Sequence, residues 1–177
     1  MFHNCESLIL NSELIKFKIE NKILLHFILI GDRVGKSSLF YKLTDGDFIK
    51  YIPSNPIDFR SKSIKEEIEK NNEIKKKKIY KLIIWDISER YIKTYYKRAD
   101  ACIILYDISE RRSFDNIKYY YDEFKKENSN AIIYLLGNKI DLIEKRKVEI
   151  KEAKEICEKY NIIWGGEYSA KTSRQGI

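Results

Sequence analysis

The chain has few of the residues that interrupt or cross-link a polypeptide. Its 177 residues include 7 Gly, 2 Pro and 3 Cys. So few glycines and prolines exclude a collagen-like or low-complexity chain, and three cysteines do not form the disulfide framework of a small secreted domain. The cysteines are widely spaced and follow no metal-binding pattern, which favours a reducing compartment. Cys102 lies in an apolar run and is expected in the core.

Long apolar runs are also missing, and none reaches the roughly 18 residues of a membrane span. Phe2 excludes N-myristoylation, which requires glycine there, and the first ten residues lack the basic segment of a signal peptide. The composition, 44% hydrophobic and 34% charged, is typical of a globular domain. The net charge of +7 suits an anionic partner, but a general lysine bias explains it equally. No motif is specific for nucleic acid, so we expect a cytoplasmic protein without a nucleic-acid partner.

Apolar runs alternate with amphipathic stretches, which predicts a βαβ architecture around a parallel sheet. We expect strands over residues 23–30, 57–68, 79–86, 101–107, 131–137 and 162–168. Helices are expected over residues 36–43, 114–124 and 150–160, and another helix should begin near residue 177. The polar segment 69–78 should be a solvated hairpin loop, with partner or membrane contact by its lysines as the alternative. Residues 1–21 are an N-terminal extension and residues 22–177 form the domain.

A glycine-containing turn follows the first predicted strand and reads GDRVGKSS. Such a turn aims backbone N–H groups at phosphate oxygens, and the next helix adds positive potential. Lys36 would reach the β- and γ-phosphates, and Ser37 would hold Mg²⁺. The usual spacing is G-x-x-x-x-G-K-S/T, and this loop is one residue shorter. The residues expected to bind nucleotide here are Gly31, Asp32, Arg33, Val34, Gly35, Lys36, Ser37 and Ser38.

Two further motifs follow later strands, at the sheet edge where parallel sheets bind ligands. They match N-K-x-D and S-A-K. The carboxylate of Asp141 can accept both N1–H and the 2-amino group of guanine, and the backbone N–H of Ala170 can donate to O6. Asn138 can tie its loop to the phosphate loop, and the stem of Lys139 can cover the base. The residues expected to recognise guanine are Asn138, Lys139, Asp141, Ser169, Ala170 and Lys171.

With these motifs the chain resembles the Ras-like small GTPases, and most closely the Rab family. The resemblance covers about residues 23–177, including the stretches YDISERRSFDNIKYY, LLGNKIDL and EYSAKT. It implies an α/β Ras-like P-loop NTPase domain: a mostly parallel six-stranded sheet with helices on both faces and a truncated final helix. It also implies a GTP/GDP-dependent switch in vesicle-mediated intracellular protein transport, peripheral on Golgi or endosomal membranes.

The resemblance also implies roles for residues outside the three motifs. Mg²⁺ would be held by Ser37, Ser54 and Asp86, and Phe48 would lean on the guanine. Regulatory and effector proteins would bind the segments from Tyr51 to Ile64 and from Trp85 to Arg98. Rab proteins carry lipidated C-terminal cysteines that this sequence does not contain. Membrane association is therefore expected only if a lipidated tail belongs to the protein.

The chain departs from the family where the γ-phosphate would lie. The third family motif, W-D-T-A-G-Q-E-R, reads WDISER from Trp85 to Arg90, without the glycine and the glutamine that positions water. Pro56 replaces a glycine and removes an N–H donor. We therefore expect a slow GTP hydrolase and assign no residue as catalytic. We interpret Arg90 as a surface charge. The alternative is a Rab-like pseudo-GTPase that acts as a protein-interaction module. A third reading is that the gaps are errors in the predicted coding sequence. Sequencing the transcript decides this.

Overall fold

The computed structural model describes residues 24–46, 48, 56–70, 73–173 and 175–176. Their strands form one seven-stranded sheet in the order β2-β3-β1-β4-β5-β6-β7. The pairs from β3 through β6 are parallel, whereas β2 and β7 run antiparallel to their neighbours at the two edges. The strands are β1 (Leu24–Ile30), β2 (Ile57–Lys70), β3 (Glu73–Ile87), β4 (Ala101–Asp107), β5 (Ile132–Asn138), β6 (Ile163–Tyr168) and β7 (Gln175–Gly176).

The six strands predicted from the apolar runs are all present, which confirms the mostly parallel α/β sheet. A short strand near the end of the described chain was not predicted: β7 pairs antiparallel with β6, whereas the helix expected to begin near residue 177 lies outside the described residues. Ser173 has a positive φ of 58°, and its N–H donates to the carbonyl of Ser169 at 2.9 Å. This tight turn reverses the chain and returns it to the edge of the sheet.

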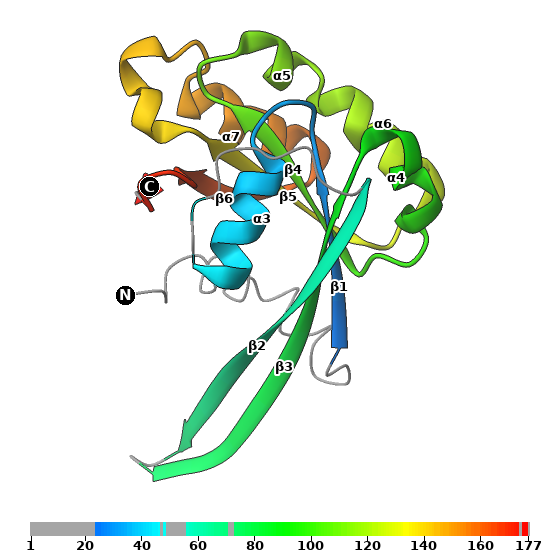
Figure 1. The fold of residues 1–177 in the computed structure, drawn as a ribbon, viewed down its shortest axis with the longest axis vertical. Coiled ribbons are helices and arrows are strands. Elements are labelled where there is room, and N and C mark those ends of the chain that lie inside the picture. The colour runs from blue at the N-terminus through cyan, green and yellow to red at the C-terminus, as the bar shows by residue number, and fades with distance from the viewer. Residues whose placement is uncertain (1–23, 47, 49–55, 71–72, 174, 177) are drawn as a thin grey trace.

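The prediction of a loop over residues 69–78 is wrong, because most of this segment continues strands β2 and β3. β2 and β3 form a long hairpin that projects from the body (Figure 1). Their register sets Glu66 opposite Lys78 and Glu67 opposite Lys77, with an irregularity after Ile68. The ladder is formed by backbone N–H and C=O groups, so a polar sequence can still form it. The N-terminal extension, residues 1–21, lies outside the described residues.

Helices cover both faces of the sheet (Figure 1). The long prediction 114–124 is split at Asn116, while the helix over residues 150–160 has the predicted bounds and a capping box of Glu149 and Glu152. None of the described helices is long and apolar enough to cross a membrane. The helices are α3 (Lys36–Asp45), α4 (Glu89–Tyr96), α5 (Arg111–Asp115), α6 (Ile117–Glu127) and α7 (Ile150–Tyr160), with the 3₁₀ turn η1 (Ile140–Lys145).

Each face of the sheet has its own core. Leu39 and Phe40 of α3 are fully buried against one face, and Phe124 of α6 is fully buried against the other. Burying such a side chain stabilises the fold by about 1.5–3 kcal/mol. Cys102 of β4 is also fully buried, as predicted. The two cores fix the parallel strands, so the carboxyl ends of β1, β3, β4, β5 and β6 share one edge of the sheet.

Candidate guanine-nucleotide site

The segment Gly31–Ser38 joins the end of β1 to α3 and curls in spite of its missing residue. Gly31 and Gly35 have φ angles of 139° and 85°, and Arg33 between them has a φ of 55°. A Cβ at Gly31 would lie 2.7 Å from the carbonyl oxygen of Leu105, so the turn requires glycine there. Three positive φ angles within five residues let a short loop make the complete turn.

Lys36 opens α3 and folds back over the turn. Its ammonium donates to the carbonyl oxygen of Gly31, and the helix continues with Leu39 N–H donating to Gly35 at 2.9 Å. The loop therefore presents a cation and a helix N-terminus on the same side, an arrangement that suits a phosphate. Asp32 and Arg33 are exposed at the tip, whereas Val34 is buried beneath it; Ser37 and Ser38 lie in the first turn of α3.

Asn138, the last residue of β5, ties the base-recognition loop to the phosphate loop. Its Nδ2 donates to the carbonyl oxygen of Val34 at 2.8 Å, across 104 residues of sequence. Its Oδ1 accepts from the N–H of Ala170 at 3.4 Å. Asn138 thus contacts two of the predicted segments, and the tie to the phosphate loop is the contact that its motif predicts.

The two loops expected to recognise guanine meet at Asp141 and Ser169. The hydroxyl of Ser169 donates to Oδ1 of Asp141 at 2.6 Å and accepts from the N–H of Thr172 at 3.1 Å. Ser169 and Ala170 are buried, whereas Lys171 is exposed. Lys139 adopts a left-handed conformation (φ 67°) and directs its ammonium to the carbonyl oxygen of Arg33 at 3.4 Å.

Asp86 near the end of β3 forms a hydrogen bond with Ser37. Burial raises the pKa of Asp86, as does the charge of Asp58, whereas the bond to Ser37 and the charge of Lys36 act in the opposite direction. No group of three or more His, Cys, Asp or Glu side chains that could hold a metal occurs among the described residues. Mg²⁺ typically takes one or two protein ligands and completes its shell with phosphate oxygens and water, so the Ser37–Asp86 pair fits it.

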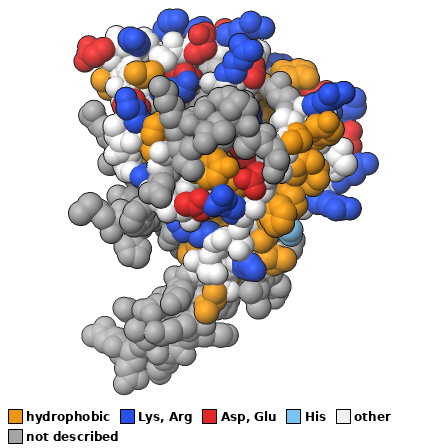
Figure 2. All heavy atoms as spheres, viewed as in Figure 1, with side chains coloured by type: hydrophobic (Ala, Val, Ile, Leu, Met, Phe, Trp, Pro, Cys, Tyr) orange, Lys and Arg blue, Asp and Glu red, His pale blue; other side chains and the backbone are white. Residues whose placement is uncertain are grey.

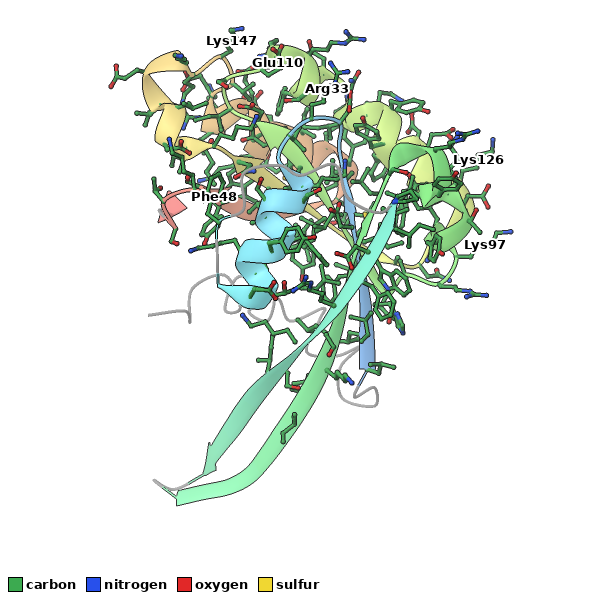
Figure 3. The ribbon with its side chains drawn as sticks, viewed as in Figure 1. Arg33, Phe48, Lys97, Glu110, Lys126 and Lys147 are labelled. Atoms are coloured by element: carbon green, nitrogen blue, oxygen red, sulfur yellow. The ribbon has the colours of Figure 1, made fainter. Side chains whose placement is uncertain are left out.

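For two of the predicted residues, the role in the site stays a prediction. Ser54 lies outside the described residues. Phe48 is 40% exposed and lies well apart from the loop tip at Arg33 in Figure 3.

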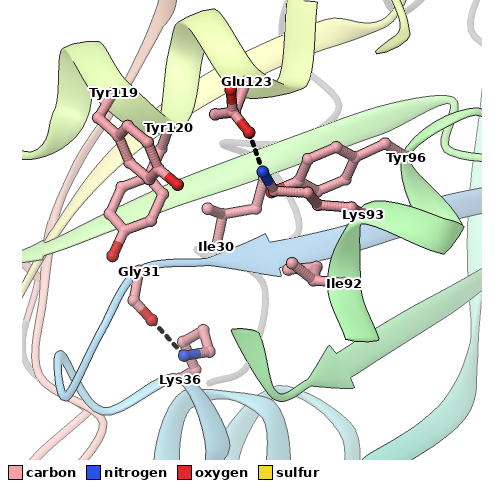
Figure 4. A pocket seen from close by; sticks show the side chains of 9 residues that line it. All are labelled: Ile30, Gly31, Lys36, Ile92, Lys93, Tyr96, Tyr119, Tyr120 and Glu123. Atoms are coloured by element: carbon pink, nitrogen blue, oxygen red, sulfur yellow. Dashed lines mark hydrogen bonds and ion pairs between the residues drawn. The ribbon is translucent and has the colours of Figure 1, made fainter. Parts of the chain in front are cut away.

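A small cavity of about 60 Å³ lies beside Lys36, between the phosphate loop, α4 and α6 (Figure 4). α4 begins within the shortened third motif, at Glu89, and the N–H of Ser88 just before it donates to the Pro56 carbonyl at 2.9 Å. The Lys93–Glu123 ion pair joins α4 to α6 over this cavity. Among the described residues that line it, none carries a carboxamide. They are Ile30, Gly31, Lys36, Ile92, Lys93, Tyr96, Tyr119, Tyr120 and Glu123.

A buried ion pair behind the base-recognition loops was not predicted. The guanidinium of Arg146 donates to both carboxylate oxygens of Glu167, at 2.7 and 2.6 Å, and the Glu167 side chain is fully buried. The phenol of Tyr106 donates to the same carboxylate at 3.4 Å. A Cβ at Gly137 would lie 2.9 Å from Glu167, so that position must stay glycine. The sequence feature that could have predicted this pair is a glutamate, Glu167, within a strand that is otherwise apolar or glycine-rich.

Comparisons with known proteins agree with this geometry. The model of the Ras family matches residues 26–175. Ras-related protein Rab-1 of Theileria parva is 38% identical over 162 residues, which cover 86% of this chain and 69% of that protein. Ras-related protein Rab-19 of Rattus norvegicus is 36% identical over 155 residues, 83% of this chain and 67% of that protein. Ras-related protein RabC of Dictyostelium discoideum is 30% identical over 148 residues, which cover 79% of this chain and 72% of that protein. The chain therefore belongs to the Ras family and is a divergent Rab-like small GTPase.

Proposed function

We propose that this small GTPase is a GTP- and GDP-dependent switch in vesicle-mediated protein transport, with slow hydrolysis. The observation that carries the proposal is the Asn138–Val34 hydrogen bond, which joins the base loop to the phosphate loop at 2.8 Å. A loop that no longer served a nucleotide would have no need of this connection. The shortened phosphate loop retains both the connection and the lysine that folds over it.

Recognition of guanine is assigned to Asp141 and Ala170. The carboxylate of Asp141 accepts from N1–H and from the 2-amino group, and the Ala170 N–H donates to O6. The bond from Ser169 fixes the carboxylate of Asp141 in the absence of a base, so the acceptor is oriented in advance. Adenine offers neither partner in this arrangement.

The phosphates and Mg²⁺ are assigned to the turn and to the Ser37–Asp86 pair. Lys36 binds the β- and γ-phosphates once its contact with Gly31 is exchanged for phosphate oxygens. Mg²⁺, when bound, would supply charge neutralisation at the phosphates. Ser37 would supply a direct oxygen and Asp86 would orient the water shell of the metal, with Ser54 as the expected third ligand.

Hydrolysis is expected to be slow because the glutamine that positions water is missing from the third motif, and no described residue lining the cavity beside Lys36 carries a carboxamide. The cavity beside Lys36 is lined by tyrosine, isoleucine and an ion pair instead. Intrinsic rates in this class are roughly 10⁻⁴ s⁻¹ even with the glutamine present. A rate below that value supports slow hydrolysis, whereas nucleotide binding that is undetectable supports the pseudo-GTPase, a module that binds proteins without a nucleotide.

Regulatory and effector proteins are expected to bind the hairpin and α4. Phe59 is 57% exposed and its ring centroid lies 4.8 Å from that of Trp85, which in turn lies 5.2 Å from Tyr95. His26 stacks on Trp85 with ring centroids 6.3 Å apart. Figure 2 shows a band of hydrophobic side chains on this face of the molecule. Exposed aromatic groups of this kind mark protein interfaces. We place the protein in the cytoplasm, at the surface of Golgi or endosomal membranes, which subcellular fractionation tests.

The decisive experiment is calorimetry of GDP and xanthosine diphosphate with the native chain and Asp141→Asn. The native chain should bind GDP and not the xanthosine nucleotide. In the variant, the amide can donate to the 2-oxo group of xanthine, so the preference should reverse. Asp115→Asn, at an exposed carboxylate of α5 that pairs with Arg111 at 3.0 Å, controls for the loss of one negative charge. Native protein that binds neither nucleotide would contradict the proposal.

A further inference from the structure

Asp107, the last residue of β4, has a buried carboxylate with partners on both oxygens. Its Oδ1 accepts from the N–H and the hydroxyl of Ser109, at 2.8 and 2.6 Å. Its Oδ2 forms an ion pair with the ammonium of Lys139 at 2.6 Å, and the Asp107 side chain is only 8% exposed. A carboxylate held from both sides can fix the position of the cation that it contacts.

Lys139 reaches this carboxylate from the neighbouring strand. Asp107 and Asn138 are register partners of β4 and β5, so Lys139 begins the base loop directly beside Asp107. The lysine stem then crosses the phosphate loop, because its Cε would lie 3.8 Å from a Cβ at Gly35. Its ammonium lies 3.4 Å from the carbonyl oxygen of Arg33. One side chain of the base loop therefore touches both the end of β4 and the phosphate loop.

We propose that Asp107 is a positioning residue that holds Lys139 across the phosphate loop before nucleotide binds. This inference rests on the proposed function and on the expectation from the motif that the stem of Lys139 covers the base. Without an anionic partner, the ammonium would be repelled by Arg33 and Lys36 in the same loop, and the long side chain would sample many rotamers. The ion pair supplies the ordering in advance, so less entropy is lost when the base docks.

A purely structural role for Asp107 predicts a different result. Its backbone N–H donates to Ser113 at 2.9 Å, and its carboxylate caps the following turn through Ser109. Loss of the turn would weaken the fold whatever residue occupies position 139. Loss of positioning matters only while Lys139 is present, so the two roles are separated by a double-mutant cycle.

The experiment measures the GDP dissociation constant of the native chain, Asp107→Asn, Lys139→Met and the double variant by calorimetry, with thermal melts to establish folding. Methionine keeps an apolar stem and removes the charge. Asp107→Asn should weaken GDP binding about tenfold in the native chain and less than about twofold in the Lys139→Met background. Equal losses in both backgrounds, or no loss in either, would overturn the inference.

Asp115→Asn is the matched control, because it removes one negative charge from an exposed carboxylate of α5 that pairs with Arg111 at 3.0 Å. It should leave GDP affinity unchanged. If Asp107→Asn does not fold, Ser109→Ala takes its place in the cycle, since it keeps the carboxylate and removes one of its supports. A native chain that binds no GDP overturns the proposed function, and this inference with it. Native binding with an additive cycle overturns the inference alone.

Discussion

Asp58 and Asp86 face each other across the β2–β3 hairpin as register partners, and the charge of Asp58 adds to burial in raising the pKa of Asp86. Tyr41 of α3 donates its phenol proton to Asp58 at 3.3 Å, which holds that carboxylate in place. Two carboxylates at facing positions on neighbouring strands repel each other. The proposed metal site is thus a place where the fold accepts unfavourable charge.

The first prediction concerns this cost. A carboxyl group whose pKa is raised on folding stabilises the fold below its unfolded value, and that contribution is lost as the pH rises through the folded value. Ionised Asp86 therefore destabilises the nucleotide-free protein at pH 7. Asp86→Asn should raise the melting temperature without Mg²⁺ by about 2–4 °C, and the gain should shrink near pH 4. The same variant should lose the Mg²⁺-dependent part of GDP binding.

Asp58→Asn is the comparison for this experiment, because it removes the neighbouring charge and leaves Asp86 and Ser37 intact. It should also raise the melting temperature while Mg²⁺-dependent binding persists. An Asp86→Asn protein that melts below the native chain would refute the account.

The second prediction concerns the buried pair behind the base loops. Arg146→Met leaves the carboxylate of Glu167 buried without its cation and should destabilise the fold by about 3–5 kcal/mol. Arg111→Met breaks the ion pair between Arg111 and Glu152 (2.5 Å), which lies at the surface, and should cost much less, because water screens exposed charges. Urea denaturation of both variants measures the difference, and equal costs would show that burial of the pair does not matter.

The third prediction concerns Gly35. A Cβ at this position would lie 2.8 Å from Nδ2 of Asn138, and the φ of 85° is unfavourable for any other residue. Gly35→Ala should push Asn138 away from Val34 and weaken GDP binding at least about tenfold, a cost of about 1.4 kcal/mol. Gly46→Ala has a similar φ of 81° at the end of α3, so it imposes the same backbone strain away from the site. It should lower the melting temperature but leave the affinity of the folded protein unchanged.

The fourth prediction concerns the exposed aromatic ring of the hairpin. Phe59→Ala should change the free energy of unfolding by less than about 1 kcal/mol, because surface substitutions cost little. Phe27→Ala, at a ring that is 2% exposed, should cost about 3–5 kcal/mol. Chemical denaturation measures both. A large cost at Phe59 would mean that the ring supports the fold rather than being available to a partner.

The motifs were predictable because their chemistry is local to each loop. The Asn138–Val34 contact followed from the type of residue, and the bounds of α7 followed from helical periodicity. The β2–β3 ladder was not predictable, because its polar residues are those of a loop and the favourable pairing depends on register. The Arg146–Glu167 and Asp107–Lys139 pairs depend on which strands are neighbours. The order of the strands in the sheet cannot be read from the sequence, so these pairs could not be predicted. α4 carried a usable signal, since Ile92 and Tyr96 recur at helical spacing.

The β2–β3 hairpin has a mechanical consequence. Its base holds Asp58 and Asp86 at the proposed metal site, and this half belongs to the sheet because Lys81–Asp86 of β3 also pair with β1. The part of β2 beyond Ser63, residues 64–70, extends about 23 Å at the rise of an ordinary strand. A tilt of about 10° where this part begins would move its far end by about 4 Å, which a spectroscopic probe at that end would follow.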